Sequence, residues 1–166
     1  DRRMTGILKV DTIQKNDGST PTAADLGLNV SGGVLQTLQD KLTSQVEFTA
    51  SAWTDSGLEI SITPTASTSK FLINAVHGVY ANDSSTARLE TRIFRSSDST
   101  EVAKSEWSLY RDGSTYKSAQ TGICLLDAPN TTSTVTYKLQ AYNSGNTVSF
   151  QVGKDNVTLT VQEIAG

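Results

Sequence analysis

Period-two alternation of apolar and polar residues in the C-terminal part of the chain is the feature that most constrains its fold, because it fits half-buried β-strands. The alternation is present in residues 135–142, 148–152 and 157–162. Turn-forming residues separate these segments, at 143–146 and again at 153–156. The pattern therefore predicts three antiparallel strands with a turn after each of the first two.

The same pattern recurs upstream and predicts about nine strands between residues 45 and 166, with no convincing helix. Residues 54–57, Thr-Asp-Ser-Gly, are expected to form a turn. Residues 70–80 form a long strand with Phe71, Ile73, Ala75 and Val79 on one face and Leu72, Val76 and Tyr80 on the other. A strand that is apolar on both faces is buried on both, so we expect one face in the core and the other in a subunit contact.

Residues 1–44 differ from the rest and are expected to form an extended N-terminal arm, while residues 45–166 form an all-β antiparallel sandwich or barrel as the head domain. Residues 1–3 precede Met4, which leaves open whether they are native. The arm carries apolar residues with no obvious internal partner, so we expect it to dock on something else; a poorly ordered terminus is the alternative. Its candidate docking residues are Ile7, Leu8, Val10, Ile13, Leu26 and Leu28.

Composition argues against several classes of partner. The net charge is −3 and basic residues do not cluster, so we expect no nucleic-acid binding. No apolar run approaches the 18 or so residues of a membrane-spanning helix, so we expect no membrane insertion. No signal-peptide pattern is seen, so we expect the protein to be assembled in a cytoplasm. The single cysteine, Cys124, lies in an apolar run and is expected to be buried and inert.

Catalytic chemistry is hard to assemble from these residues. The only histidine, His77, is expected to be a satisfied core or interface residue, with no metal or other cofactor. Paired carboxylates for glycoside cleavage remain open among Asp83, Glu90, Glu101 and Glu106, although surface charge is the commoner explanation. We therefore expect a protein that is not an enzyme, and keep a glycan-cleaving enzyme as a minor alternative.

Several segments resemble small tail-fibre and virion surface proteins of phages that infect aquatic bacteria. Residues 7–14 and 21–28 are similar to the start of those proteins, and residues 54–58 with 62–64 to their first hairpin. Residues 127–132, 135–140 and 163–166 are similar to their C-terminal half. The resemblance is weakest between about residues 81 and 116.

The resemblance implies a homotrimeric head similar to the jelly-roll heads of the tumour necrosis factor and complement C1q type. The candidate residues for the trimer interface are Leu72, Val76, Tyr80, Phe94, Tyr142 and Phe150. The resemblance also implies that this is a virion protein whose partners are the tail, baseplate or major capsid protein.

Two roles compete. A fibre-like appendage or tail fibre would bind a host surface glycan or protein through loops such as 82–86, 96–100 and 111–116. A capsid decoration protein would use its arm to stabilise the head, and its loops would need no ligand.

Overall fold

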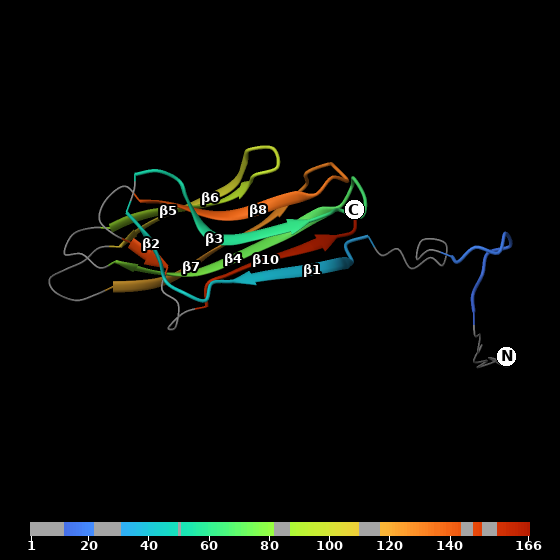
Figure 1. Ribbon diagram of the computed structural model, residues 1–166, viewed down its shortest axis with the longest axis horizontal. Coiled ribbons are helices and arrows are strands. Elements are labelled where there is room, and N and C mark those ends of the chain that lie inside the picture. Colours follow the sequence, from blue (N-terminus) through green and yellow to red (C-terminus); the bar gives the residue numbers. More distant parts are fainter. Residues whose placement is uncertain are drawn as a thin grey trace, which may run out of the picture.

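Every regular element in the computed structural model is a β-strand (Figure 1), and the strands pack as two antiparallel sheets. The structure describes residues 12–21, 31–49, 51–81, 87–109, 117–143, 148–150 and 156–166. Sheet A contains β1 (Val34–Lys41), β2 (Val46–Phe48), β4 (Lys70–Ala81), β7 (Lys117–Asp127), β9 (Val148–Phe150) and β10 (Thr158–Ile164). Sheet B contains β3 (Thr54–Ile62), β5 (Ala87–Arg95), β6 (Thr100–Leu109) and β8 (Val135–Asn143).

The strands pair as a nested ribbon, in which the first strands pair with the last and each later pair lies inside the one before it. In sheet B, β3 pairs with β8 and β5 pairs with β6; in sheet A, β4 pairs with β7, and β1 and β2 pair with β10 and β9. Each sheet is therefore four strand rows wide, in the orders β1/β2, β10/β9, β4, β7 and β3, β8, β5, β6. Eight strand rows folded over in this way form a jelly roll, which confirms the predicted all-β sandwich.

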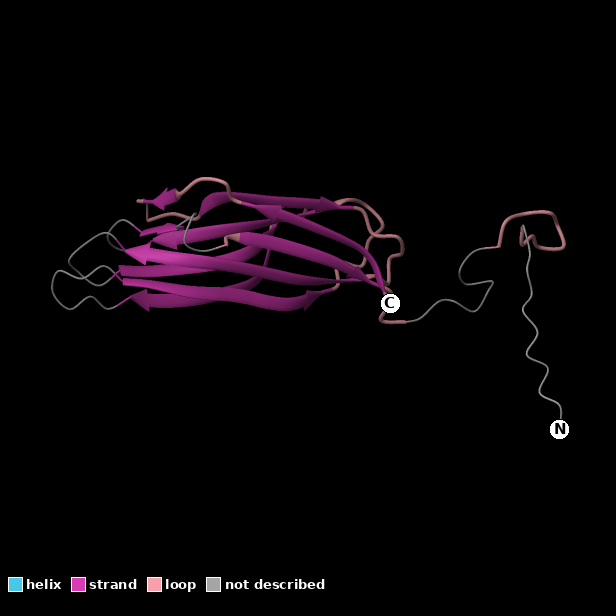
Figure 2. Ribbon diagram, turned by 90° about the horizontal axis from the view of Figure 1, so that it is seen from below, coloured by secondary structure: helices cyan, strands magenta, loops and turns pink. Residues whose placement is uncertain are grey.

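The hydrophobic core fills the space between the sheets, and the predicted alternation places its residues correctly. Phe71, Ile73 and Ala75 of β4 are fully buried, as are Tyr137 and Leu139 of β8 in the facing sheet. Successive strand residues point to opposite faces, so the polar members of each alternating segment face outward. Figure 2 shows the sandwich turned by 90°, with the described part of the arm, residues 12–21, lying apart from it.

The expected turn between the last two strands does not reverse the chain. Both β9 and β10 pair antiparallel with the same edge of β4, β9 with residues 79–81 and β10 with residues 70–76. The two strands therefore run in the same direction, as one interrupted row. Residues 151–155, which hold most of the expected turn, lie outside the described residues.

Residues 54–57 form a β-bulge within β3 instead of the expected turn. The pairing with β8 shifts between Asp55 and Glu59. Gly57 adopts a φ of 90°, and the Leu58 amide donates a hydrogen bond to the Ser56 hydroxyl. The Asp-Ser-Gly sequence supplies the same left-handed glycine to a bulge as to a turn, which is why the two could not be told apart.

The boundary between arm and head also differs from the expected one at residue 44. β1, which was expected to lie in the arm, is the outer strand of sheet A, and Leu42 joins the core. The Gly32 amide donates to the Ala165 carbonyl and the Ala165 amide to the Gly33 carbonyl. The sandwich therefore begins at about Gly32, because β10 supplies the partner that β1 lacked in the sequence.

Candidate functional site

The candidate docking residues of the arm are mostly beyond the described part of the chain. Ile7, Leu8, Val10, Leu26 and Leu28 all lie outside it. Ile13 is described and is 50% exposed. Near it, the Ser19 amide and hydroxyl both donate to Asp17, which lowers the pKa of that carboxyl, and the Lys15 amide donates to the Ser19 carbonyl.

The six candidate interface residues occupy three different places. Leu72, Val76 and Tyr80 are partly exposed on the outer face of β4. Phe94 and Tyr142 are partly exposed on the outer face of sheet B.

Phe150 cannot belong to a trimer interface, because it is fully buried between the sheets. Its ring packs edge-on against Phe48, with 4.7 Å between centroids. Its place in the alternation of β9 turns it inward.

The outer face of sheet A is almost free of charge. Across β1, β10, β4 and β7, the described outward side chains include two lysines, Lys41 and Lys70, and no Asp or Glu. The rest are threonines, amides, aliphatic residues and glycines, with Tyr80, Ser118 and Cys124. Gly78 and Gly122 bring no side chain, and beside them Val76 and Gln120 help line a shallow hollow of about 480 Å³.

Cys124 and Leu126 of β7 also lie on the outer face of sheet A, beside Asn74 and Leu72 of β4. The thiol is exposed, so the expected burial of Cys124 is wrong, and Leu126 is 55% exposed. Both positions could have been assigned from the sequence, because Ile123 and Leu125 were expected to point inward and the period of two turns their neighbours outward.

The outer face of sheet B has the opposite character. Its described outward side chains include five acids and three bases. Many are paired across strands, at 3.0 Å from Lys104 to Glu90, 3.0 Å from Arg92 to Glu101 and 2.8 Å from Lys138 to Asp55. Hydrogen bonds from Lys138 and Gln140 hold the pKa of Asp55 below its usual value. Many charged side chains of this face therefore pair with one another, and such a face can remain in contact with solvent.

Three half-buried aromatic residues and one arginine form a cluster on this outer face of sheet B. The Arg92 guanidinium carbon lies 4.2 Å from the Trp53 ring centroid and 4.7 Å from that of Phe94. The Trp53 and Tyr142 rings are 5.6 Å apart at 50°. We call Trp53, Phe94, Tyr142 and Arg92 the aromatic platform. No sequence pattern pointed to it, since its members come from a loop and two strands.

Of the carboxylates considered for glycoside cleavage, the three that the structure describes lie among other charged side chains on the outer face of sheet B. Glu90 and Glu106 face each other across β5 and β6, and Glu90 also binds Lys104. Glu101 binds Arg92, and Asp83 lies outside the described residues. Within the described ranges, no group of three His, Cys, Asp or Glu side chains is placed to hold a metal ion. The same ranges contain no helix long and apolar enough to cross a membrane.

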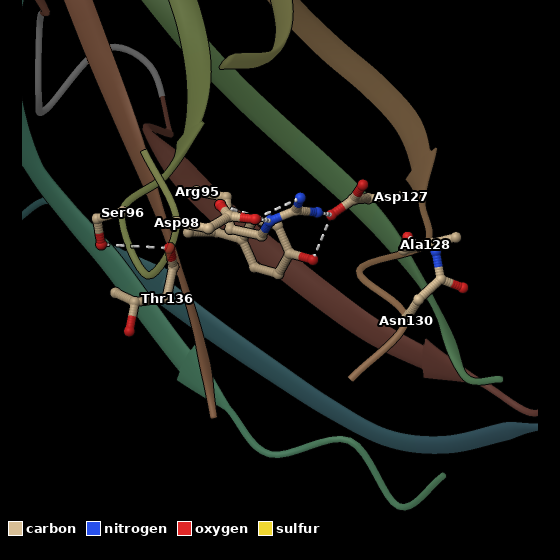
Figure 3. Close-up of polar contacts among 8 residues, drawn as sticks. Arg95, Ser96, Asp98, Asp127, Ala128, Asn130 and Thr136 are labelled. Carbon is tan, nitrogen blue, oxygen red and sulfur yellow. Dashed lines mark hydrogen bonds and ion pairs between the residues drawn. The ribbon is translucent and has the colours of Figure 1, made fainter. Parts of the chain in front are cut away.

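The most buried ion-pair cluster ties the two sheets together (Figure 3). Arg95, at the end of β5, donates to both Asp98 oxygens and to Asp127 at the end of β7. The Tyr137 hydroxyl donates to the same Asp127 oxygen at 2.6 Å. The hydrogen bond to Asp98 raises the pKa of Arg95, whereas burial and the bond to Asp127 raise the pKa of Tyr137. Each charged group in this cluster is paired, so the cluster acts as a clamp that links the two sheets and offers no free reactive group.

A second buried carboxylate fastens the loop between β3 and β4. Glu163 is fully buried, and its oxygens accept hydrogen bonds from the Thr65 amide at 2.6 Å, the Thr65 hydroxyl at 2.7 Å and the Gln36 amide at 2.6 Å. Burial raises the pKa of Glu163, but hydrogen bonds from Ser69, Gln36 and Thr65 outweigh it and hold the pKa below its usual value. This carboxylate is structural too.

His77 was expected in the core or at an interface, with its hydrogen bonds satisfied. It lies in the core, but its ring makes no hydrogen bond to a described residue. It is fully buried with its ring 4.8 Å from that of Phe150. Neither ring nitrogen has a hydrogen-bond partner among the residues that the structure describes. Burial lowers the pKa of His77 to about 4.

Of the three loops expected to contact a ligand, only residues 96–100 are described in full. Ser97 and Asp98 line a hollow of about 250 Å³ together with Thr131 and Ser133. Hydroxyls dominate this hollow, and its one carboxylate, Asp98, is engaged by Arg95. The hollow thus presents weak polar groups and no catalytic pair.

Comparison with known proteins finds little that is close. No protein-family model and no curated protein matches the chain. Among solved structures, one of the infectious bursal disease virus Gt strain matches with a TM-score of 0.39 and 16% identity over 82% of this chain. The D431N mutant VP2 protein of the same virus, as T=1 particles, matches with a TM-score of 0.39 and 17% identity over 78%. This chain covers 39% and 36% of those chains. At such scores the similarity carries no argument about function.

Proposed function

We propose that this protein is a structural protein of a phage virion, a homotrimeric fibre-like appendage that is displayed on the particle surface and is not an enzyme. The observation that carries the proposal is the contrast between the two outer faces of the sandwich. An uncharged sheet face can be buried against another subunit without the cost of removing charges from water. The sequence resemblance to phage surface proteins supports the virion location.

Sheet A is the face we assign to the trimer. Leu72, Val76 and Leu126 supply apolar area, and the threonines and amides around them both donate and accept hydrogen bonds, so copies of one chain can satisfy each other. The charged face of sheet B then points outward. The arm precedes the sandwich, which begins at about Gly32, and in this proposal it contacts another virion protein.

Replacement of Leu126 by arginine tests the trimer face. The residue is 55% exposed in the isolated chain, so we expect the variant to fold but to associate at least tenfold more weakly, because a charge would be buried at the interface. Light scattering at micromolar concentration measures the mass. Thiol labelling of Cys124, the only cysteine, should be slow in the wild-type trimer and fast in the variant.

Ser61, exposed on the outer face of sheet B, provides the matched control position. Ser61→Arg should leave the trimer unchanged. A monomeric wild-type protein, or equal loss of trimer in both variants, would contradict the assignment of sheet A.

Removal of residues 1–30 tests the role of the arm, and gold-labelled antibody against the full-length protein tests the location. We expect the truncated protein to remain a folded trimer that no longer joins the particle, since the described sandwich begins at about Gly32. The label should lie at the tail. Label spread over the head would favour a capsid decoration protein instead, and unfolding of the truncated chain would place the arm in the core.

A further inference from the structure

The aromatic platform on the outer face of sheet B is not needed by the fold. Its residues lie outside the core, on a face that is otherwise charged, and each keeps part of its surface exposed. Trp53 precedes β3, Phe94 lies on β5 and Tyr142 lies on β8, so three separate parts of the chain bring their rings together. Partly exposed aromatic rings gathered in one place on a charged face suggest a surface that contacts something else.

Polar side chains beside the rings are already held in position. The Arg92 Nε donates to Gln140 Oε1 at 2.8 Å, and its Nη1 donates to Glu101 Oε2 at 3.0 Å. Gln140 in turn donates to Asp55. This chain of hydrogen bonds runs across the sheet and fixes the rotamers, so a ligand would lose little entropy in ordering them.

The chemistry of these groups selects the class of ligand. An aromatic ring offers an apolar face with negative π density, which suits the C–H face of a sugar ring. Asp55 and Glu101 are exposed, and their remaining lone pairs suit sugar hydroxyls, whereas Gln140 is buried and only holds Arg92 and Asp55 in place. The described outward side chains of the face have a net charge of −2, from five acids and three bases, which disfavours phosphate, sulfate or carboxylate groups.

We propose that the aromatic platform binds a neutral saccharide, with its ring stacked on the face of Trp53 that Arg92 does not cover and its hydroxyls bound by Asp55 and Glu101. This inference rests on the proposed function, because a trimer built through sheet A leaves sheet B facing outward. It moves the expected glycan contact from the loops to the outer face of sheet B. The site is repeated in each subunit, so even weak binding would be strengthened by multivalency.

The experiment is affinity electrophoresis of the full chain in gels that contain mannan, dextran or galactan, with heparin as the anionic comparison. We expect at least one neutral polymer to retard the wild-type protein. Trp53→Ala should weaken that retardation at least tenfold, and Trp53→Phe, which keeps an aromatic face, should stay within about threefold of the wild type.

A second variant covers the case in which Trp53→Ala does not fold. Asp55 is exposed, and Asp55→Asn should weaken binding at least fivefold without unfolding the protein. Glu106→Gln, on the same face but outside the platform, is the control and should bind normally. Retardation by heparin alone, by no polymer, or equally in wild type and Trp53→Ala would overturn the proposal. Light scattering and virion labelling test the trimer and its location separately, so a failure of binding would not be confused with a failure of either.

Discussion

Replacing Arg95 with methionine is expected to lower the free energy of unfolding by about 3–5 kcal/mol, the usual cost of breaking a buried ion pair by removing one partner. The Arg95 side chain is 10% exposed and that of Asp127 is 13% exposed. Without the guanidinium, the Asp127 carboxylate keeps the Tyr137 hydroxyl but loses its cation in a poorly hydrated place. Urea unfolding at pH 7 and a fixed protein concentration measures the change.

Two further variants make this test specific. Lys104→Met removes an ion pair with Glu90 whose cation is exposed to solvent, and it should cost much less than Arg95→Met. The double variant Arg95→Met/Asp127→Leu should recover part of the loss, because no buried charge is then left without a partner. A change below about 1 kcal/mol in Arg95→Met would show that the clamp does not hold the sheets together.

His77 is expected to make the sandwich less stable as the pH falls from about 6.5 to 4. Its pKa is about 4 in the folded protein and about 6.5 in the unfolded chain, so the unfolded chain binds more protons between these values. The stability is fully present above about pH 6.5 and is lost progressively down to about pH 4. At about 1.36 kcal/mol for each pKa unit, the total loss is about 3 kcal/mol.

His77→Leu is the variant that isolates this effect. Leucine has a similar volume and no ionisable group, and it removes two buried nitrogens that lack described partners, so stability at pH 7 should be equal or higher. Urea unfolding between pH 7 and 4.5 should then be nearly flat for the variant and should fall for the wild type. A parallel decline in both proteins would assign the acid sensitivity to other groups. Asp98 and Glu163 titrate at lower pH, because hydrogen bonds lower their pKa values.

The alternating segments made the fold class and the inward residues predictable from sequence. The inward-facing residues of β4 and β8 follow directly from a period of two. Once one face of a strand is buried, every second residue must point inward and the others outward. Pairing partners were not predictable in the same way. Periodicity does not state which strand lies beside which, so β1 was left without a partner and β9 and β10 were expected to be separated by a turn.

The polar clusters were beyond sequence reasoning for a related reason. Arg95 and Asp127 are 32 residues apart and meet only because β5 and β7 end at the same end of the sandwich. Glu163 and Gln36 are separated by 127 residues. The aromatic platform likewise depends on the register of β8 between β3 and β5.

The nested ribbon has a consequence for how the protein can fold. Because β1 pairs with β10, the outer strand of sheet A has no partner until the last of the described strands has been synthesised. Pairings between such distant segments make folding slow. During that interval the edges of β4 and β1 are open to strands of other chains. Newly made chains are therefore at risk of aggregation at high expression, and making fewer chains at one time or lowering the temperature should raise the yield of folded protein.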